Sequence, residues 1–163
     1  STTVAASQPE CADAGSFIQS SGTQNSGSAK TSSQKASKHT ISNVASIAPK
    51  MDSRVLKAYK KLGFTVTIDP SVNYGGCFNA HSRSIILRFE NETIYHELGH
   101  FLAFVAGNVD RTSDFAAVYN SEKSKFTGIN RSYATQNSSE YFAESVLEYV
   151  TSPSTLKRQR PKT

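Results

Sequence analysis

The sequence has no apolar stretch approaching the roughly 20 residues that a membrane-spanning helix requires. Its first residues, STTVAASQPE, lack the charged-then-apolar pattern of a signal peptide. Charge is also sparse, since 19% of the 163 residues are charged, with 18 Lys+Arg against 13 Asp+Glu. We therefore expect a soluble, mildly basic chain of one domain, or one domain with a tail, that does not insert into membranes.

Cysteine is scarce, with only Cys11 and Cys77 in the chain. We predict that these two cysteines form a disulfide that joins the N-terminal segment to the rest of the protein. A disulfide would indicate an oxidising compartment, so we expect a secreted, extracellular protein. The alternative is that the two cysteines are unrelated thiols.

Apolar residues are almost missing from residues 1–40, which are rich in Ser and Thr and show neither a helical nor a strand period. We interpret this segment as a strap or linker that precedes a domain over residues 41–163. Lys30, Lys35 and Lys38 lie in it without neighbouring aromatic residues. A solvated tail therefore explains them better than nucleic-acid binding, and we expect no nucleic-acid partner.

Periodic segments of the remaining sequence predict a mostly helical α+β domain with a small sheet. Residues 71–80 contain Gly75 and Gly76 and are interpreted as a loop or hairpin turn. The expected elements are one or two helices between Ile41 and Gly63, the strands FTVTID and SRSIILRF, and helices over TIYHELGHFLAFVAG, Thr112 to Lys123 and SSEYFAESVLEYV.

The long apolar helix contains the motif His96-Glu97-Leu98-Gly99-His100. Residues four apart lie on one face of a helix, so both imidazoles can reach a single metal ion. Glu97 follows the first histidine and can act on a metal-bound water. The motif predicts a zinc site with a catalytic glutamate.

A catalytic zinc site needs a third protein ligand besides the two histidines. The motif is not followed by H-x-x-G-x-x-H, which excludes a third histidine from that pattern. The last helix offers Glu140, Glu144 and Glu148 on one face. Spacing alone does not choose among these three carboxylates.

The HELGH motif together with Tyr133-Ala-Thr-Gln-Asn-Ser-Ser-Glu140-Tyr-Phe-Ala-Glu144 resembles the catalytic domain of the anthrax lethal factor family, which includes the single-domain Pro-Pro endopeptidases. The resemblance implies a zincin-like fold, one Zn²⁺ per chain and a catalytic domain over residues 41–163. It implies His96, His100 and Glu140 as zinc ligands, with Glu140 supplied by the C-terminal helix. Glu144 is then implied as an acid that steadies a ligand histidine, and Tyr133 as a hydroxyl facing the scissile carbonyl.

These roles agree with the chemistry of the side chains. Zinc lowers the pKa of its bound water to about 7. Glu97 can accept the proton of that water and pass it to the departing amine. Tyr133, as a neutral phenol, can donate a hydrogen bond to the developing oxyanion.

The strand that leads into the zinc helix offers a candidate substrate site. If it lies at the edge of the sheet, the backbone of Ile85, Ile86 and Leu87 could pair with an extended peptide. The alternative is a buried central strand, because the run is apolar on both faces.

The sequence as a whole indicates a secreted, monomeric zinc metalloendopeptidase of the HExxH...E gluzincin type, acting on extended segments of a protein or peptide substrate. The alternative is a non-catalytic extracellular binding or adhesion module that zinc stabilises.

Overall fold

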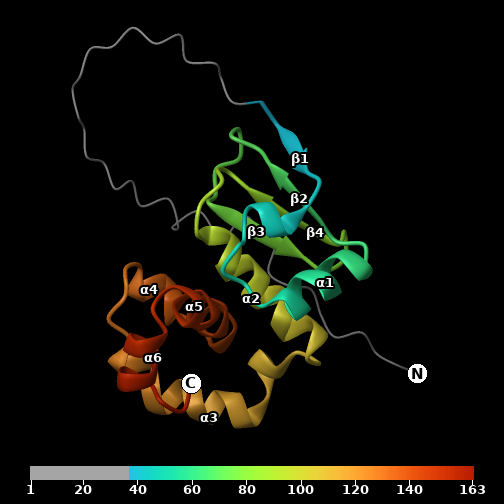
Figure 1. Ribbon diagram of the computed structural model, residues 1–163. Helices are drawn as coiled ribbons and strands as arrows, with labels where there is room; N and C mark the ends of the chain where they lie inside the picture. Colours follow the sequence, from blue (N-terminus) through green and yellow to red (C-terminus); the bar gives the residue numbers. More distant parts are fainter. Residues whose placement is uncertain (1–36) are drawn as a thin grey trace, which may run out of the picture.

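The computed structural model describes residues 37–163, in which a small sheet packs on a group of helices (Figure 1). The strands are β1 (His39–Ile41), β2 (Thr65–Ile68), β3 (Gly76–Asn79) and β4 (Ser84–Leu87). The helices are η2 (Val44–Ser46), α1 (Ser53–Lys61), α2 (Thr93–Val105), η3 (Val109–Arg111), α3 (Ser113–Glu122), η4 (Lys123–Lys125), α4 (Arg131–Ala134), α5 (Ser138–Thr151) and α6 (Pro153–Gln159). The predicted α+β class is confirmed.

The sheet has the order β1-β2-β4-β3. β4 lies between β2, with which it runs parallel, and β3, with which it runs antiparallel. The prediction that Ile85, Ile86 and Leu87 form an edge strand is therefore wrong. Their backbone groups are already used by two neighbouring strands, which suits a strand that is apolar on both faces.

β3 occupies the sheet edge that was expected of β4. Gly75 and Gly76 predict a loop or turn over residues 71–80, but Gly76 begins the strand. A Cβ at Gly76 would lie 2.8 Å from Oε1 of Glu97, so glycine is needed here to let the backbone approach α2. The hairpin from β3 to β4 turns at Arg83, which has a φ of 52°.

The segment before α1 also differs from its prediction. Ile41, Val44 and Ile47 follow a helical spacing, yet Ile41 belongs to β1 and Val44 to a single 3₁₀ turn. Their apolar side chains contribute to the same core without forming an α-helix, because β1 pairs with β2. α1 begins at Ser53 and is capped by Asp52, whose carboxylate accepts the N–H of Arg54.

α2 lies on one face of the sheet and forms the centre of the core (Figure 1). Its residues Ile94, Leu98 and Phe101 are fully buried. They pack with Ile85 and Leu87, which alternate with half-buried Ile86 along β4. No helix among residues 37–163 combines the length and apolar character needed to cross a membrane.

α5 packs against α2 on the side away from the sheet (Figure 1). Gly99 lies at the contact, where an added Cβ would stand 2.8 Å from Cα and 2.9 Å from the carbonyl oxygen of Ala143. Two small residues therefore bring the two helix backbones together. This approach places the N-terminal half of α5 over the histidine face of α2.

After α5 the chain forms a further short helix, α6, although the last helix expected from the sequence is SSEYFAESVLEYV. Proline at the first position of a helix loses no hydrogen bond, and α6 begins there. Arg160, just after α6, is 1% exposed and pairs with Glu148 of α5.

Two predictions depend on residues outside the described part of the chain. Cys77 is buried on β3, but Cys11 lies outside the described residues, so the predicted disulfide stays a prediction. The predicted strap over residues 1–40 lies almost wholly outside them as well, and secretion stays a prediction too.

Replacing Gly99 with Ala tests the contact between α2 and α5. In a helix free of close neighbours, Ala is more stable than Gly by about 1 kcal/mol. Because the backbone of Ala143 cannot move aside cheaply, we expect Gly99→Ala to destabilise the protein by about 1–3 kcal/mol, measured by urea unfolding. A stabilised variant would show that the two helices do not approach so closely.

Candidate metal centre

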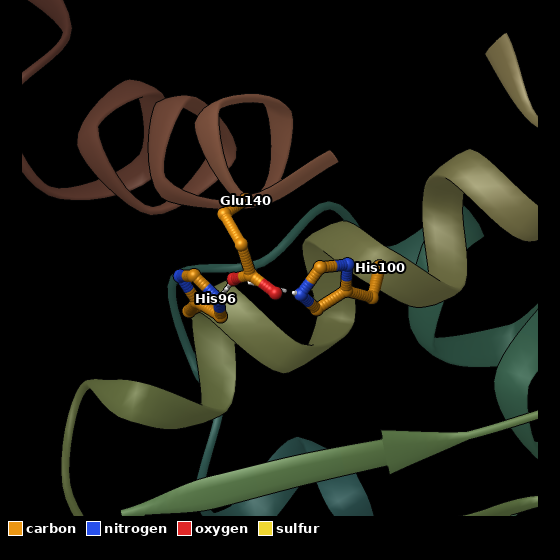
Figure 2. Close-up of side chains that lie close together, drawn as sticks. All are labelled: His96, His100 and Glu140. Atoms are coloured by element: carbon orange, nitrogen blue, oxygen red, sulfur yellow. Dashed lines mark hydrogen bonds and ion pairs between the residues drawn. The ribbon is translucent and has the colours of Figure 1, made fainter. Parts of the chain in front are cut away.

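Two histidines and one glutamate converge between α2 and α5 (Figure 2). His96 and His100 lie one turn apart on α2, and the carboxylate of Glu140 descends from α5 between their rings. Glu140 Oε2 lies 2.9 Å from Nε2 of His96 and 3.3 Å from Nε2 of His100. The structure thus brings together the three residues that the resemblance implied as ligands.

The start of α5 fixes the position of Glu140. Asn137 caps the helix, and its side-chain oxygen accepts the N–H of Glu140 at 2.8 Å. Glu140 therefore lies in the first turn, where the positive end of the helix dipole favours a carboxylate.

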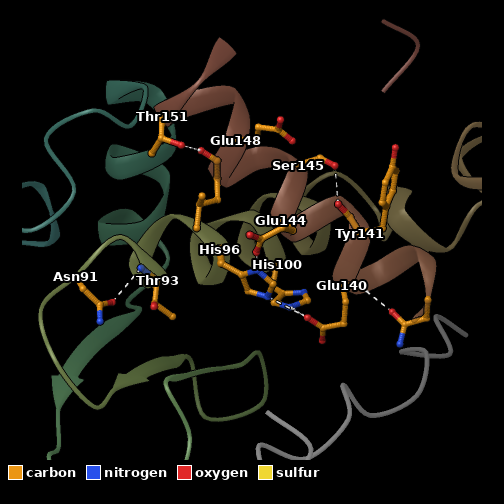
Figure 3. A network of polar contacts seen from close by, with 12 residues as sticks. Asn91, Thr93, His96, His100, Glu140, Tyr141, Glu144, Ser145, Glu148 and Thr151 are labelled. Carbon is orange, nitrogen blue, oxygen red and sulfur yellow. Dashed lines mark hydrogen bonds and ion pairs between the residues drawn. The ribbon is translucent and has the colours of Figure 1, made fainter. Parts of the chain in front are cut away.

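Glu144 lies one turn further along α5, on the same face as Glu140 (Figure 3). Its Oε2 is 2.7 Å from Nδ1 of His96, so the two ring nitrogens of His96 face two different carboxylates. Nδ1 of His100, in contrast, is buried and has no hydrogen-bond partner among the described residues. The ring of His100 stacks instead on Phe78 of β3, with centroids 6.4 Å apart and an interplanar angle of 16°.

The carboxylates shift the protonation of the cluster. Burial opposes charge on His96, but its hydrogen bonds with Glu140 and Glu144 outweigh burial and raise its pKa well above 6.5. Burial likewise works against ionisation of Glu140, yet the contacts with His100 and His96 hold the pKa of Glu140 far below its usual range. The site therefore favours an ionised Glu140 facing a protonated His96.

Glu97 lies beside this cluster and is 5% exposed. Burial raises the pKa of its carboxyl group, His96 and His100 act in the opposite direction, and the net shift is upward. Its side chain contacts the edge strand of the sheet, since Gly76 leaves no space there for a Cβ. Glu97 thus lies between the histidine pair and the backbone of β3.

Tyr133 comes from the short helix α4, which packs against α5. Its ring centroid lies 6.2 Å from that of His96. Burial raises the pKa of the phenol, and the negative charges of Glu140 and Glu97 raise it further. The phenol is therefore neutral at physiological pH and keeps a proton to donate.

Two nitrogens and one oxygen make this set suitable for zinc, which binds His nitrogen and Glu oxygen in catalytic sites. The three candidate ligand atoms all lie within 4.8 Å of one another, and all three residues are buried. The second nitrogen of His96 has the carboxylate partner that ligand histidines usually have. The residues therefore fit a metal ion of this kind.

Other predicted residues lie elsewhere. Ile85 and Leu87 are buried in the core, and Ile86 lies on the opposite face of β4. Glu148, the third carboxylate left open by spacing, pairs with Arg160 instead of the histidines. Sequence reasoning missed the contacts of Gly76 and Phe78 with the site, because a four-residue strand that begins with glycine has no clear period.

Two comparisons with known proteins indicate the family and the fold of the chain. The family described as anthrax toxin lethal factor, N- and C-terminal domain, matches residues 79–163. Among solved structures, the Pro-Pro endopeptidase of Paenibacillus alvei has a similar fold, with a TM-score of 0.57 and 18% sequence identity, covering 72% of this chain and 85% of the other. No curated protein sequence matches the chain.

The charge pairing predicts how the metal-free protein responds to pH. A raised pKa of His96 stabilises the fold below pH 6.5, and this stability is lost as the pH rises through the folded pKa. The raised pKa of Glu97 acts in the same direction, because its ionisation also opposes folding. We therefore expect chelator-treated protein to resist urea less at about pH 9 than at about pH 6.

Two variants make this measurement specific. Glu144→Gln should weaken the pH dependence, because it removes one of the charges that raise the pKa of His96. Replacing the exposed His81 with Asn should leave it unchanged. Greater stability at the higher pH would contradict the charge pairing.

Proposed function

This chain belongs to the anthrax toxin lethal factor family, and from this premise we propose that it is a secreted zinc endopeptidase that cleaves extended segments of proteins. The observation that carries the proposal is the meeting of Glu140 with Nε2 of both histidines, beside the buried Glu97. A binding function does not require an acid at position 97.

In the proposed site His96, His100 and Glu140 would hold one zinc ion. When bound, zinc lowers the pKa of a water molecule to about 7 and polarises a peptide carbonyl. Glu144 accepts the Nδ1 proton of His96, so that Nε2 would present its lone pair to the metal. Glu140 supplies negative charge from the first turn of α5.

Glu97 is the proposed general base. Its raised pKa suits Glu97 to take a proton from the attacking water, hold it and return it to the departing amine. Tyr133 keeps its proton and donates a hydrogen bond to the oxyanion. Glu97 thus carries the proton, and Tyr133 stabilises the negative charge of the oxyanion.

The edge strand β3 is the proposed place for the substrate backbone. Gly75 O accepts the N–H of Arg88, so the alternation of antiparallel pairs directs the N–H and C=O of Gly76 and Phe78 away from β4. Gly76 also contacts Glu97. A peptide that pairs with these groups would lie along the same edge as the proposed base.

Replacing Glu97 with Gln tests the proposed base. We expect turnover of an unbiased peptide library to fall at least 10²-fold, because proton transfer is lost, while about one zinc per chain is retained. Glu92→Gln, at an exposed position near the start of α2, is the matched control and should keep wild-type activity. Cleavage by Glu97→Gln at the wild-type rate would refute the assignment.

Chelation separates the enzyme from the alternative of a zinc-stabilised binding module. An enzyme site should lose activity on chelation, regain it on addition of zinc and unfold only modestly, because the apolar core does not include the metal. Circular dichroism of the chelated protein measures this. Cooperative loss of the fold, with no peptidase activity in the loaded protein, would favour the binding module.

A further inference from the structure

Asp110 is a buried acid outside the cluster of proposed ligands. It lies in η3, the turn that follows α2, and only 1% of its surface is exposed. The chain turns at Asn108, whose φ of 60° is left-handed, and this turn brings Asp110 to the start of α5. An acid at this position connects the end of one ligand-bearing helix with the beginning of the other.

Two serines of α5 bind Asp110 through separate groups. The hydroxyl of Ser139 donates to Oδ2 of Asp110 at 2.6 Å, and the hydroxyl of Ser138 donates to its carbonyl oxygen at 2.8 Å. Glu140 is the next residue along the helix. The clamp formed by Asp110, Ser138 and Ser139 therefore ends one residue before the carboxylate that faces both histidines.

The other carboxylate oxygen of Asp110 is costly to bury. Oδ1 is inaccessible to solvent and has no hydrogen-bond partner among the described residues. An incompletely paired buried carboxylate opposes folding. The positive end of the dipole of α5, a helix of 14 residues, offsets part of that cost and draws the acid towards the helix start.

We propose that Asp110 is a positioning residue that fixes the start of α5 so that Glu140 faces His96 and His100. The inference rests on the proposed function in so far as these three residues bind zinc. The close contact of Gly99 with Ala143 fixes α5 on the other side of Glu140. Glu140 thus lies between two points at which α5 is held.

The test measures the zinc Kd of folded variants by competition with a chromophoric chelator. Removal of an outer partner of a metal site typically weakens binding by about 10–100-fold. Because Asp110 acts through Ser139 and the helix start, we expect Asp110→Ala to raise the Kd by about tenfold. Ser139→Ala should raise it by a smaller factor, and the double variant should match Asp110→Ala alone.

Two further variants separate charge from position. Asp110→Asn keeps an oxygen that can accept from Ser139, so its Kd should lie between those of the wild type and Asp110→Ala. Asp114→Asn removes an exposed acid from the adjacent first turn of α3 and should leave the Kd unchanged. Urea unfolding of each metal-free variant reports stability separately.

The outcomes distinguish the inference from the proposed function. Equal zinc Kd values for the wild type, Asp110→Ala and Ser139→Ala, with only the unfolding midpoint changed, would overturn the positioning role and leave the zinc site intact. If Asp110→Ala does not fold, Ser139→Ala decides, because it removes one hydroxyl and favours helix. Failure of the wild type to bind zinc would overturn both.

Discussion

The close packing of α5 on α2 is the contact on which the site depends. Gly99 and Ala143 let the two backbones approach, and this approach brings the carboxylate of Glu140 to the Nε2 atoms of His96 and His100. The sheet holds α2 from the other side through its buried apolar face. Helix α2 is thus fixed between two layers, and the polar residues lie where the second layer meets it. A change at this contact would alter the site even without touching a polar side chain.

The electrostatics of the site also follow from this packing. Three carboxylates, those of Glu97, Glu140 and Glu144, lie around two histidines in a region from which water is largely excluded. Such a concentration of acids is unfavourable unless positive charge compensates it. Protonated histidine does so in part, which is why the pKa of His96 is raised. A divalent cation would compensate it more fully, and this balance is the physical reason for proposing a metal at this place.

Sequence reasoning predicted the parts of the site that a local pattern encodes. His96, Glu97 and His100 follow from helical spacing, whereas Glu140 could be distinguished from Glu144 and Glu148 only through the family resemblance. The predicted position of β4 at the sheet edge was wrong, because strand order depends on pairing with distant segments. β3 was missed because its glycine resembles a turn signal, although it serves a close backbone contact with α2. No local pattern indicated Asp110 either. Its role depends on the turn after α2 lying next to the start of α5, which only the tertiary structure determines.

We propose that one zinc ion is bound by His96, His100 and Glu140. X-ray absorption spectroscopy at the zinc edge of the loaded protein tests it directly, because imidazole, carboxylate and thiolate ligands differ in distance and scattering. If these three residues bind the ion, the spectrum should show two imidazole nitrogens at about 2.0–2.1 Å with the remaining ligands oxygen, and the zinc Kd of Glu140→Ala should rise. Sulfur scattering at about 2.3 Å, or an unchanged zinc Kd in Glu140→Ala, would contradict the assignment.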